Sequence, residues 1–364
     1  MVISVSKFLG AFRTKLRHNR RKYGRSLNRG LLNSGAEQLE IRSLLSNTVL
    51  ISLSSGGALD FQGDDQSNGI EIHVDSVGIH ATGSSALDTQ IKFQGQTYAP
   101  GTEVLLTTGQ TLSNFNAGLK SGNDNFLIRV DSGTLIDSGY MVINGNSGND
   151  TITVSTASGA TLDIGVDLIV YGGGGDDRIV AATDEALNNL STGDPSAVFN
   201  GSKDITTQSR FVMLGQGGND ILVLGGASAG TTIKLEGGAG SDHVGVSDVQ
   251  VTSTMVVDTG DGNDCFVGSN LNVGGQLIVR DPSGINKVGL FQSSLAGVLT
   301  VKLGTGTDQL RLDTVNVNGS LVSLYGGAGH DSLQSNIDLS NAQIYSFDNQ
   351  NAAIDFSDCL AVFH

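Results

Sequence analysis

Short turns that end in aspartate are the residues of this sequence with the most evident chemical potential. The run GGAGSDHVGV, residues 237–246, ends its turn at Asp242, and similar Gly-x-Asp turns recur along most of the chain. Repeated carboxylates of this kind can bind a cation such as Ca²⁺ through oxygen ligands, or they can accept hydrogen bonds from backbone amides. The candidate ligands are Asp124, Asp150, Asp177, Asp220, Asp242, Asp264, Asp308 and Asp331.

These aspartates recur with a period of about 22 residues. Their successive spacings are 26, 27, 43, 22, 22, 44 and 23, and the midpoint of the 44-residue gap holds Asn286 in place of an aspartate. Asn68 stands in a similar place earlier in the chain, which gives ten anchor positions. A period of this length over most of a chain indicates a repeat architecture if the core positions keep the same register.

The apolar residues do keep that register. Positions nine before, seven before and two after the ten anchors hold thirty apolar residues without exception. Because residues two apart in a strand face the same side, these columns predict strands that face one core on both sides of the turn. In the most regular coils a third pair follows, such as Val249 with Val251, which predicts three short strands per coil.

The sequence therefore predicts an all-β fold, a parallel β-helix (β-solenoid) with coils of about 22 residues. A right-handed parallel β-helix is expected because that hand is the frequent one in this family of folds, not because of this sequence. The 51 glycines and three prolines fit many tight turns, some of which need positive φ or close backbone approach. Residues 47–340 are expected to form the repeat domain and residues 341–364 its C-terminal cap. Within it, residues 73–114 are expected to be one or two degenerate coils, and residues 181–210 either a degenerate coil or a projecting loop.

The first 46 residues differ from the rest in charge. They carry ten of the 21 Lys and Arg residues, whereas the remaining chain has 11 basic and 34 acidic residues, a net charge of -23. An acidic domain repels phosphate backbones and anionic lipids, so nucleic-acid binding is disfavoured for it. No stretch of the sequence reaches 18 apolar residues, so no transmembrane helix is expected.

Residues 1–46 are expected to be a basic export or sorting segment with short helical parts. Their last ten residues, EQLEIRSLLS, resemble the LEPR-XLL segment of secreted and surface proteins of planctomycete bacteria, with Ile41 in place of the proline. The resemblance implies export to the cell surface or the extracellular space. A long signal peptide with its apolar part at residues 44–53 is an alternative, and so is a basic segment that binds nucleic acid or membrane.

Two of the turns, GGAGSDHVGV and GGAGHDSL, resemble the GGxGxDxUx nonapeptide of RTX (hemolysin-type) calcium-binding repeats. That resemblance implies Ca²⁺ at the eight aspartates. In the RTX family the nonapeptides follow one another in tandem, whereas here one turn occurs per coil, so the next coil must supply the second wall of each ion site. The alternative, in which each aspartate caps its own turn through backbone hydrogen bonds and binds no metal, also remains open.

The remaining acidic, histidine and cysteine residues give weaker indications of a functional site. Glu236 and Asp258 occupy the same outward position in successive coils and are the candidate catalytic carboxylates for glycoside chemistry. Arg280 and Lys302 continue that column, so a compensated charge ladder on an exposed face is the simpler interpretation. His243 and His330 are expected to face solvent. The two cysteines, Cys265 and Cys359, have no zinc-ligand spacing and are too few for a disulfide framework.

These observations favour an exported, non-enzymatic surface or matrix protein whose elongated acidic solenoid serves structure, adhesion or calcium binding. The alternative is a carbohydrate-active enzyme, a polysaccharide lyase or glycosidase, on a β-helix scaffold. Expected partners are extracellular polysaccharide or other surface proteins, and not nucleic acid. The sequence leaves the partner, the oligomeric state and the removal of residues 1–46 open.

Overall fold

The computed structural model describes residues 47–191, 202–319, 321–350 and 353–363. The chain divides into two units, residues 1–44 and 45–364, and the described residues belong to the second. The helical parts and the export segment expected in residues 1–46 lie outside the described residues.

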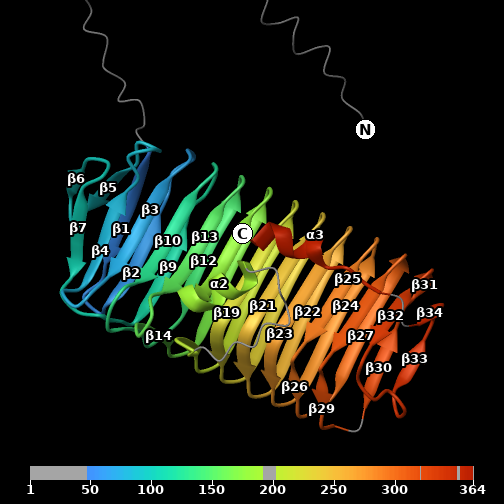
Figure 1. Ribbon diagram of the computed structural model, residues 1–364. Helices are drawn as coiled ribbons and strands as arrows, with labels where there is room; N and C mark the ends of the chain where they lie inside the picture. The colour runs from blue at the N-terminus through green and yellow to red at the C-terminus, as the bar shows by residue number, and fades with distance from the viewer. Residues whose placement is uncertain (1–46, 192–201, 320, 351–352, 364) are drawn as a thin grey trace, which may run out of the picture. The chain divides into compact units, whose positions relative to one another are not determined.

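Most described residues belong to one of two parallel sheets that run side by side along the solenoid (Figure 1). The first sheet contains β1 (Thr48–Leu53), β2 (Ala58–Gln62), β5 (Gln90–Phe93), β6 (Gln96–Tyr98), β9 (Asn114–Gly118), β12 (Met141–Ser147), β15 (Asp167–Gly174), β18 (Arg210–Gly217), β20 (Thr232–Ala239), β22 (Thr254–Asp261), β24 (Gln276–Ser283), β27 (Leu299–Gly306), β30 (Val322–Tyr325), β31 (Ala328–Gly329) and β33 (Gln343–Tyr345).

The second sheet contains β3 (Gly69–Val74), β4 (Ile79–Gly83), β7 (Glu103–Thr107), β8 (Thr111–Leu112), β10 (Asn125–Val130), β11 (Thr134–Asp137), β13 (Thr151–Thr156), β14 (Thr161–Ile164), β16 (Arg178–Thr183), β17 (Ile205–Thr207), β19 (Ile221–Ala229), β21 (His243–Val251), β23 (Cys265–Val273), β25 (Lys287–Phe291), β26 (Ser294–Leu295), β28 (Gln309–Asp313), β29 (Asn316–Val317), β32 (Ser332–Ser335) and β34 (Asn349–Gln350). Three short helical elements complete the structure: α2 (Asp184–Ser191), α3 (Ser357–Leu360) and the 3₁₀ turn η2 (Ala361–Phe363).

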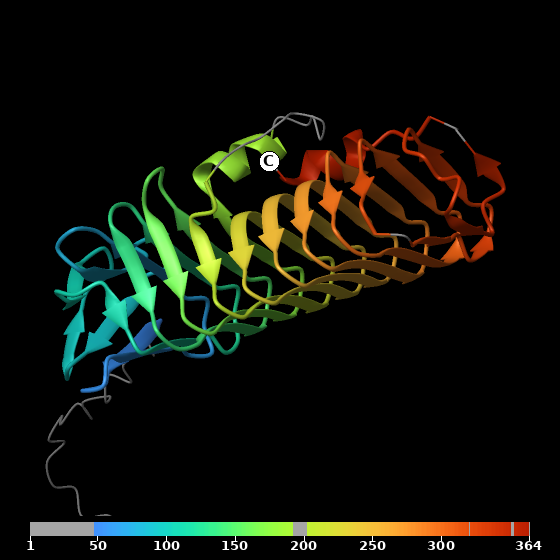
Figure 2. The ribbon, with the colours of Figure 1, turned by 90° about the horizontal axis from the view of Figure 1, so that it is seen from below.

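The fold is the predicted β-solenoid, with about 10 turns of about 23 residues each. Figure 2 shows the coils in succession, each strand lying beside its equivalent in the next coil. Leu235 pairs with Val257, Val257 with Val279 and Val279 with Val301, so the predicted register is confirmed. All thirty predicted column residues are buried except Val322, which is half-buried. Their burial is the main stabilising contribution, at roughly 1.5–3 kcal/mol for each aliphatic side chain before conformational entropy is subtracted.

The prediction of three separate strands per coil is wrong in the most regular coils. The second and third apolar pairs share one nine-residue strand, as in β21 and β23. These strands bend at the sixth residue after the anchor, where Asp248 and Asn270 have φ values of 57° and 52°. A left-handed residue turns the strand without ending its pairing, and Asn and Asp tolerate this conformation better than most residues.

Residues 73–114 do not form the degenerate coils that were expected. β3 pairs antiparallel with β4, β4 with β7, β5 with β6 and β1 with β2. The chain returns to the solenoid at β8, which pairs parallel with β11. The antiparallel strands lie at one end of the solenoid, where they pair with backbone groups that an exposed end would leave open.

Residues 181–210 combine a coil with an insertion. α2 follows β16 directly, and β17 resumes the coil by pairing with β14 and β19. Residues 192–201, within the insertion, lie outside the described residues.

Residues 341–364 serve two purposes. β33 and β34 pair with β30 and β32 and so add to the last coil. Residues 353–363, which we call the strap, lie against the outer surface of the second sheet, where α3 contacts β23 (Figure 1).

Candidate functional site

The eight aspartates predicted as calcium ligands form one continuous ladder inside the corner between the two sheets. Each aspartate Oδ1 accepts a hydrogen bond from the backbone N–H of the anchor residue one coil earlier, as when Asp220 N–H donates to Asp242 Oδ1 (2.7 Å). The ladder begins at Asn68 N–H, which donates to Asp124 (2.6 Å), and ends at Asp331, which accepts from Asp308 (3.0 Å). Asn286 takes its place in the ladder through its own side-chain oxygen (2.9 Å). The structure therefore brings all eight residues together as links between coils.

The second oxygen of each ladder carboxylate is buried without a hydrogen-bond partner. This holds for Oδ2 of all eight aspartates, whose exposed fractions are between 0 and 3%. In several coils that oxygen lies over the glycine five residues earlier: a Cβ added to Gly215 would be 2.3 Å from Asp220 Oδ2 and 2.6 Å from the carbonyl oxygen of Gly237. The first glycine of the GGAGSD-type turn is thus required because the carboxylate occupies the space of a side chain.

Burial changes the protonation of the ladder. Desolvation raises the pKa of Asp150, Asp177, Asp242 and Asp264 to about 7, although the backbone hydrogen bond on Oδ1 opposes the shift. Asp124, Asp220 and Asp308 reach pKa values of about 6 for the same reason, and the pKa of Asp331 is also raised by desolvation. Near neutral pH the four carboxyl groups with a pKa of about 7 are therefore close to half-protonated, because an ionised carboxylate without a partner is costly to bury.

The ladder carboxylates lie in a closely packed corner of the coils. Ca²⁺ needs six to eight oxygen ligands at about 2.3–2.6 Å, whereas Oδ2 of Asp150, Asp177, Asp220, Asp242 and Asp331 each lies in a slot too small for a Cβ on the facing glycine. Among the described residues, no group of three or more His, Cys, Asp or Glu side chains is arranged to hold a metal ion.

Glu236 and Asp258 lie side by side on the outer face of the first sheet. They are register partners, and Arg280 and Lys302 follow in the next two coils. Lys234 Nζ lies 2.5 Å from Glu236 Oε2, and Lys302 Nζ lies 5.7 Å from the ring centroid of Tyr325. Desolvation and then Glu236 raise the pKa of Asp258, while Arg280 lowers it. The two candidate carboxylates are thus brought together, within a column where each acid has a basic neighbour.

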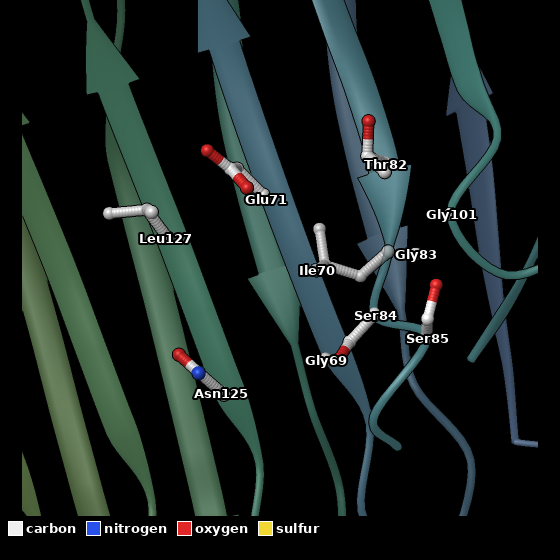
Figure 3. Close-up of a pocket in the computed structure, with 10 residues that line it drawn as sticks. All are labelled: Gly69, Ile70, Glu71, Thr82, Gly83, Ser84, Ser85, Gly101, Asn125 and Leu127. Atoms are coloured by element: carbon white, nitrogen blue, oxygen red, sulfur yellow. The ribbon is translucent and has the colours of Figure 1, made fainter. Parts of the chain in front are cut away.

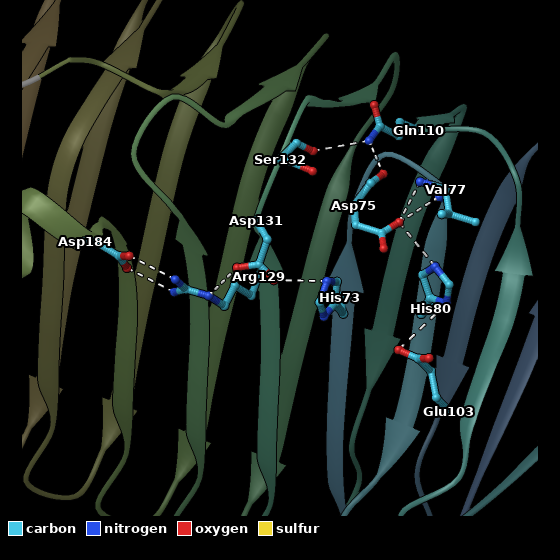
Figure 4. Close-up of polar contacts among 11 residues, drawn as sticks. His73, Asp75, Val77, His80, Glu103, Gln110, Arg129, Asp131, Ser132 and Asp184 are labelled. Atoms are coloured by element: carbon cyan, nitrogen blue, oxygen red, sulfur yellow. Dashed lines mark hydrogen bonds and ion pairs between the residues drawn. The ribbon is translucent and has the colours of Figure 1, made fainter.

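A network of charged side chains that the sequence did not predict covers part of the second sheet near the antiparallel strands (Figure 4). His73 and His80 are register partners with ring centroids 6.1 Å apart. His73 Nε2 lies 3.0 Å from Asp131 Oδ2, and His80 Nε2 lies 3.4 Å from Asp75 Oδ1. Both histidines come from the irregular stretch between two anchors, so no repeat register could have indicated that they meet.

The same network continues to α2. Arg129 donates two hydrogen bonds to Asp184 (3.0 and 2.9 Å) and one to Asp131 (2.7 Å), and these carboxylates raise its pKa. Backbone N–H groups of Val77 and Gly78 lower the pKa of Asp75. Arg129 pairs with both Asp131 and Asp184, so the network joins a coil to α2 by ion pairs and to the hairpin by the contacts of the two histidines.

One cavity of about 270 Å³ opens beside this region, between the hairpin and β10 (Figure 3). Short polar side chains form much of its lining, with Ser84, Ser85 and Thr82 opposite Asn125. The lining contains one carboxylate, that of Glu71. This volume lies below the roughly 300–1,000 Å³ of ordinary small-molecule sites, and the lining pairs no base with a nucleophile. The cavity therefore has the character of a surface hollow.

The strap covers an apolar stripe on the outer face of the second sheet. Phe363 and Phe356 lie where Gly245 and Gly289 have no side chains: added Cβ atoms would be 2.9 Å from their rings. The buried cluster comprises Val180, Ala182, Val223, Cys265, Val267, Phe291, Ile354, Phe356, Cys359, Leu360 and Phe363. The outward third position after the anchors holds Val180, Val223, Gly245, Val267 and Gly289, an apolar column that could have indicated a covered face.

A disulfide between Cys265 and Cys359 joins the strap to β23 across 94 residues of sequence. Cys265 lies on the outer face of β23, and its partner comes from the strap. Beside it, Lys287 Nζ lies 2.7 Å from Asp358 Oδ2. His243 is half-buried next to the strap, which corrects the prediction that it faces solvent, and this burial lowers its pKa. His330 is 90% exposed, as predicted.

Comparisons with known proteins gave no match: no family model, no curated protein and no solved structure is similar to this chain. Among the described residues there is no helix long and apolar enough to cross a membrane.

Proposed function

We propose that this chain is an exported, non-enzymatic surface or matrix protein whose acidic β-solenoid serves as a structural and adhesive shaft. The observation that carries this proposal is that nearly every repeated residue contacts the neighbouring coil. Apolar columns, amide ladders and buried carboxylates all join one coil to the next. Such one-dimensional stacking suits a protein that spans distance or presents a long surface.

The disulfide supports the proposal of export. Disulfides form and persist in oxidising compartments and are rare where cytosolic reductants act. The strap depends on this bond and on a few apolar contacts, so an oxidising environment favours the closed arrangement. The LEPR-XLL-like segment and the net charge of -23 beyond it agree with a location at the cell surface or in the extracellular matrix.

Calcium binding at the Gly-x-Asp turns is a second candidate function. It is favoured by eight buried Oδ2 atoms that lack a hydrogen-bond partner, since a buried charge is normally paired or bound to a metal. The carbohydrate-active alternative rests on the adjacency of Glu236 and Asp258, which their basic neighbours explain equally well.

Export is tested by expressing the full chain in a bacterium that displays surface proteins. The cells are treated with a membrane-impermeant biotin reagent and, separately, with a thiol-alkylating reagent during lysis. We expect surface labelling that depends on residues 1–46, together with Cys265 and Cys359 protected from alkylation. Retention in the cytoplasm with both thiols alkylated would contradict the proposal. Binding of the purified chain to cell-wall polysaccharide, compared before and after removal of that polysaccharide, tests the adhesive role.

A further inference from the structure

Lys203 and Asp248 meet in a buried position outside the carboxylate ladder. Lys203 Nζ contacts Asp248 Oδ1, and Asn270 Nδ2 donates a hydrogen bond to the same oxygen (2.8 Å). The Asp248 side chain is 1% exposed and that of Lys203 is 26% exposed. Asp248 Oδ2 is buried without a hydrogen-bond partner. An amino group therefore lies against one side of a carboxyl group whose other oxygen is unsatisfied.

The surroundings favour the uncharged form of Asp248. Burial raises the pKa of Asp248, although Lys203 and Asn270 act in the opposite direction. An ion pair in such a place gains less from its attraction than it loses in hydration unless every remaining lone pair is satisfied, which Oδ2 is not. A neutral carboxylic acid next to a neutral amine is the pair that can condense to an amide.

A third residue, Glu185, lies near this pair. Its charge contributes to the raised pKa of Asp248, which places it within electrostatic range. Glu185 belongs to the first turn of α2, and the next residue, Ala186, packs onto Gly225 so closely that a Cβ there would be 2.6 Å from the Ala186 methyl group. α2 is thereby held over β19 and β21, and Glu185, which is exposed, lies within electrostatic range of Asp248.

We propose that Lys203 and Asp248 are a modification site at which the chain forms an intramolecular isopeptide bond. In the reaction, the Lys203 ammonium group transfers a proton to the Asp248 carboxylate, and the freed lone pair of Nζ attacks Cγ of the protonated acid. Glu185 accepts a proton from the nitrogen and returns it to the departing hydroxyl group, which leaves as water. One N–C bond forms and one C–O bond breaks, with no oxidant, metal or cofactor. The product is a neutral amide, which removes two charged groups from a buried position.

The cross-link ties the end of the insertion to the bend of β21. Lys203 precedes β17, and Asp248 is the residue with φ of 57° in the middle of β21, so the bond spans 45 residues and two coils. A covalent bond there prevents the insertion from peeling away from the solenoid under tension. The inference holds whether or not the protein is adhesive.

Mass spectrometry of the purified full chain tests the proposal. After reduction of the disulfide, we expect an intact mass lower than that of its sequence by one water, and a proteolytic peptide that joins the segments containing Lys203 and Asp248. The Lys203→Arg variant should show its full mass and two separate peptides. A wild-type chain at full mass, with the two peptides unlinked, would overturn the proposal even if every variant failed to fold.

Two further variants test the parts of the mechanism. Glu185→Gln should slow bond formation by on the order of 10²-fold, the usual contribution of a positioned proton acceptor, with an unchanged circular dichroism spectrum. Cross-linking of this variant at the wild-type rate would refute the role of Glu185. Lys287→Arg is the matched control, since Lys287 pairs with Asp358, whose side chain is 65% exposed, and it should retain the loss of one water.

Discussion

Replacing Asp242 by asparagine should make the stability of the solenoid less dependent on pH. Asn286 shows that an amide oxygen can accept the ladder hydrogen bond as a carboxylate does, at 2.9 Å from Asp264 N. The substitution therefore keeps the link to Asp220 N–H and removes one titrating group. In calcium-free buffer, any change in the pH dependence of unfolding then reports on the protonation of the ladder.

The expected magnitude follows from the pKa of Asp242. Burial raises this pKa to about 7 in the folded chain, from 3.8 for an exposed aspartate. Because the folded state holds its proton more tightly, this group stabilises the fold most below pH 3.8, and the stabilisation is lost as the pH rises through 7. A difference of roughly three pH units corresponds to about 4 kcal/mol as an upper limit, of which about 3 kcal/mol is lost between pH 5 and pH 8.

The assay is urea unfolding of wild type and Asp242→Asn at pH 5 and pH 8 with a calcium chelator present. Between pH 5 and pH 8, we expect the free energy of unfolding to fall by about 3 kcal/mol less for Asp242→Asn than for wild type. Asp65→Asn is the control, since Asp65 is exposed and its replacement makes the same chemical change outside the ladder. Parallel pH profiles for wild type and Asp242→Asn would refute the reasoning, because they would mean that Asp242 stays ionised and compensated in the fold.

Three further predictions concern the strap, the glycine column and the calcium hypothesis. Cys359→Ser should lower the thermal midpoint, and a reducing agent should lower that of wild type equally while leaving the variant unchanged; a loss of 2–4 kcal/mol is typical for a disulfide. Gly215→Ala should destabilise the fold by about 1–3 kcal/mol because its Cβ would meet Asp220 Oδ2 at 2.3 Å, whereas Gly217→Ala has open space and should be neutral; equal unfolding midpoints for the two variants would contradict this. If the ladder binds calcium, added Ca²⁺ should raise the thermal midpoint and chelation should reverse the change, and no shift in either direction would reject the calcium site.

The repeat could be predicted because each coil solves the same packing problem. A residue such as Leu235 must be apolar and must lie above Met213 and below Val257, so the solution reappears in the sequence once per coil. The bends within the second-sheet strands were missed because the residues at that position, among them Asp248, Asn270 and Gln292, share a backbone conformation but not a chemical type.

The strap and the network at the antiparallel strands could not be predicted for a different reason. Both join segments that occur once in the chain, so no second copy reveals their register. Cys265 and Cys359 are 94 residues apart in sequence, and only the path of the last residues back along the solenoid brings them together. His73 and His80 meet because a hairpin reverses the chain between two anchors, a choice that the apolar pattern does not determine.

The coil of Asn286 indicates what the corner of the solenoid requires. In the coils from Asp124 to Asp331, this is the one whose anchor is an amide, and it also carries an acid, Asp281, in the column that elsewhere holds glycine, threonine or leucine. Asp281 is 1% exposed with both oxygens unpartnered, and desolvation raises its pKa to about 9. A carboxyl group with that pKa is neutral at pH 7 and can donate its proton to a nearby oxygen. Each of these coils thus retains one buried acid at the corner, although its position in the sequence changes, which is expected if protonated carboxyl groups join the coils.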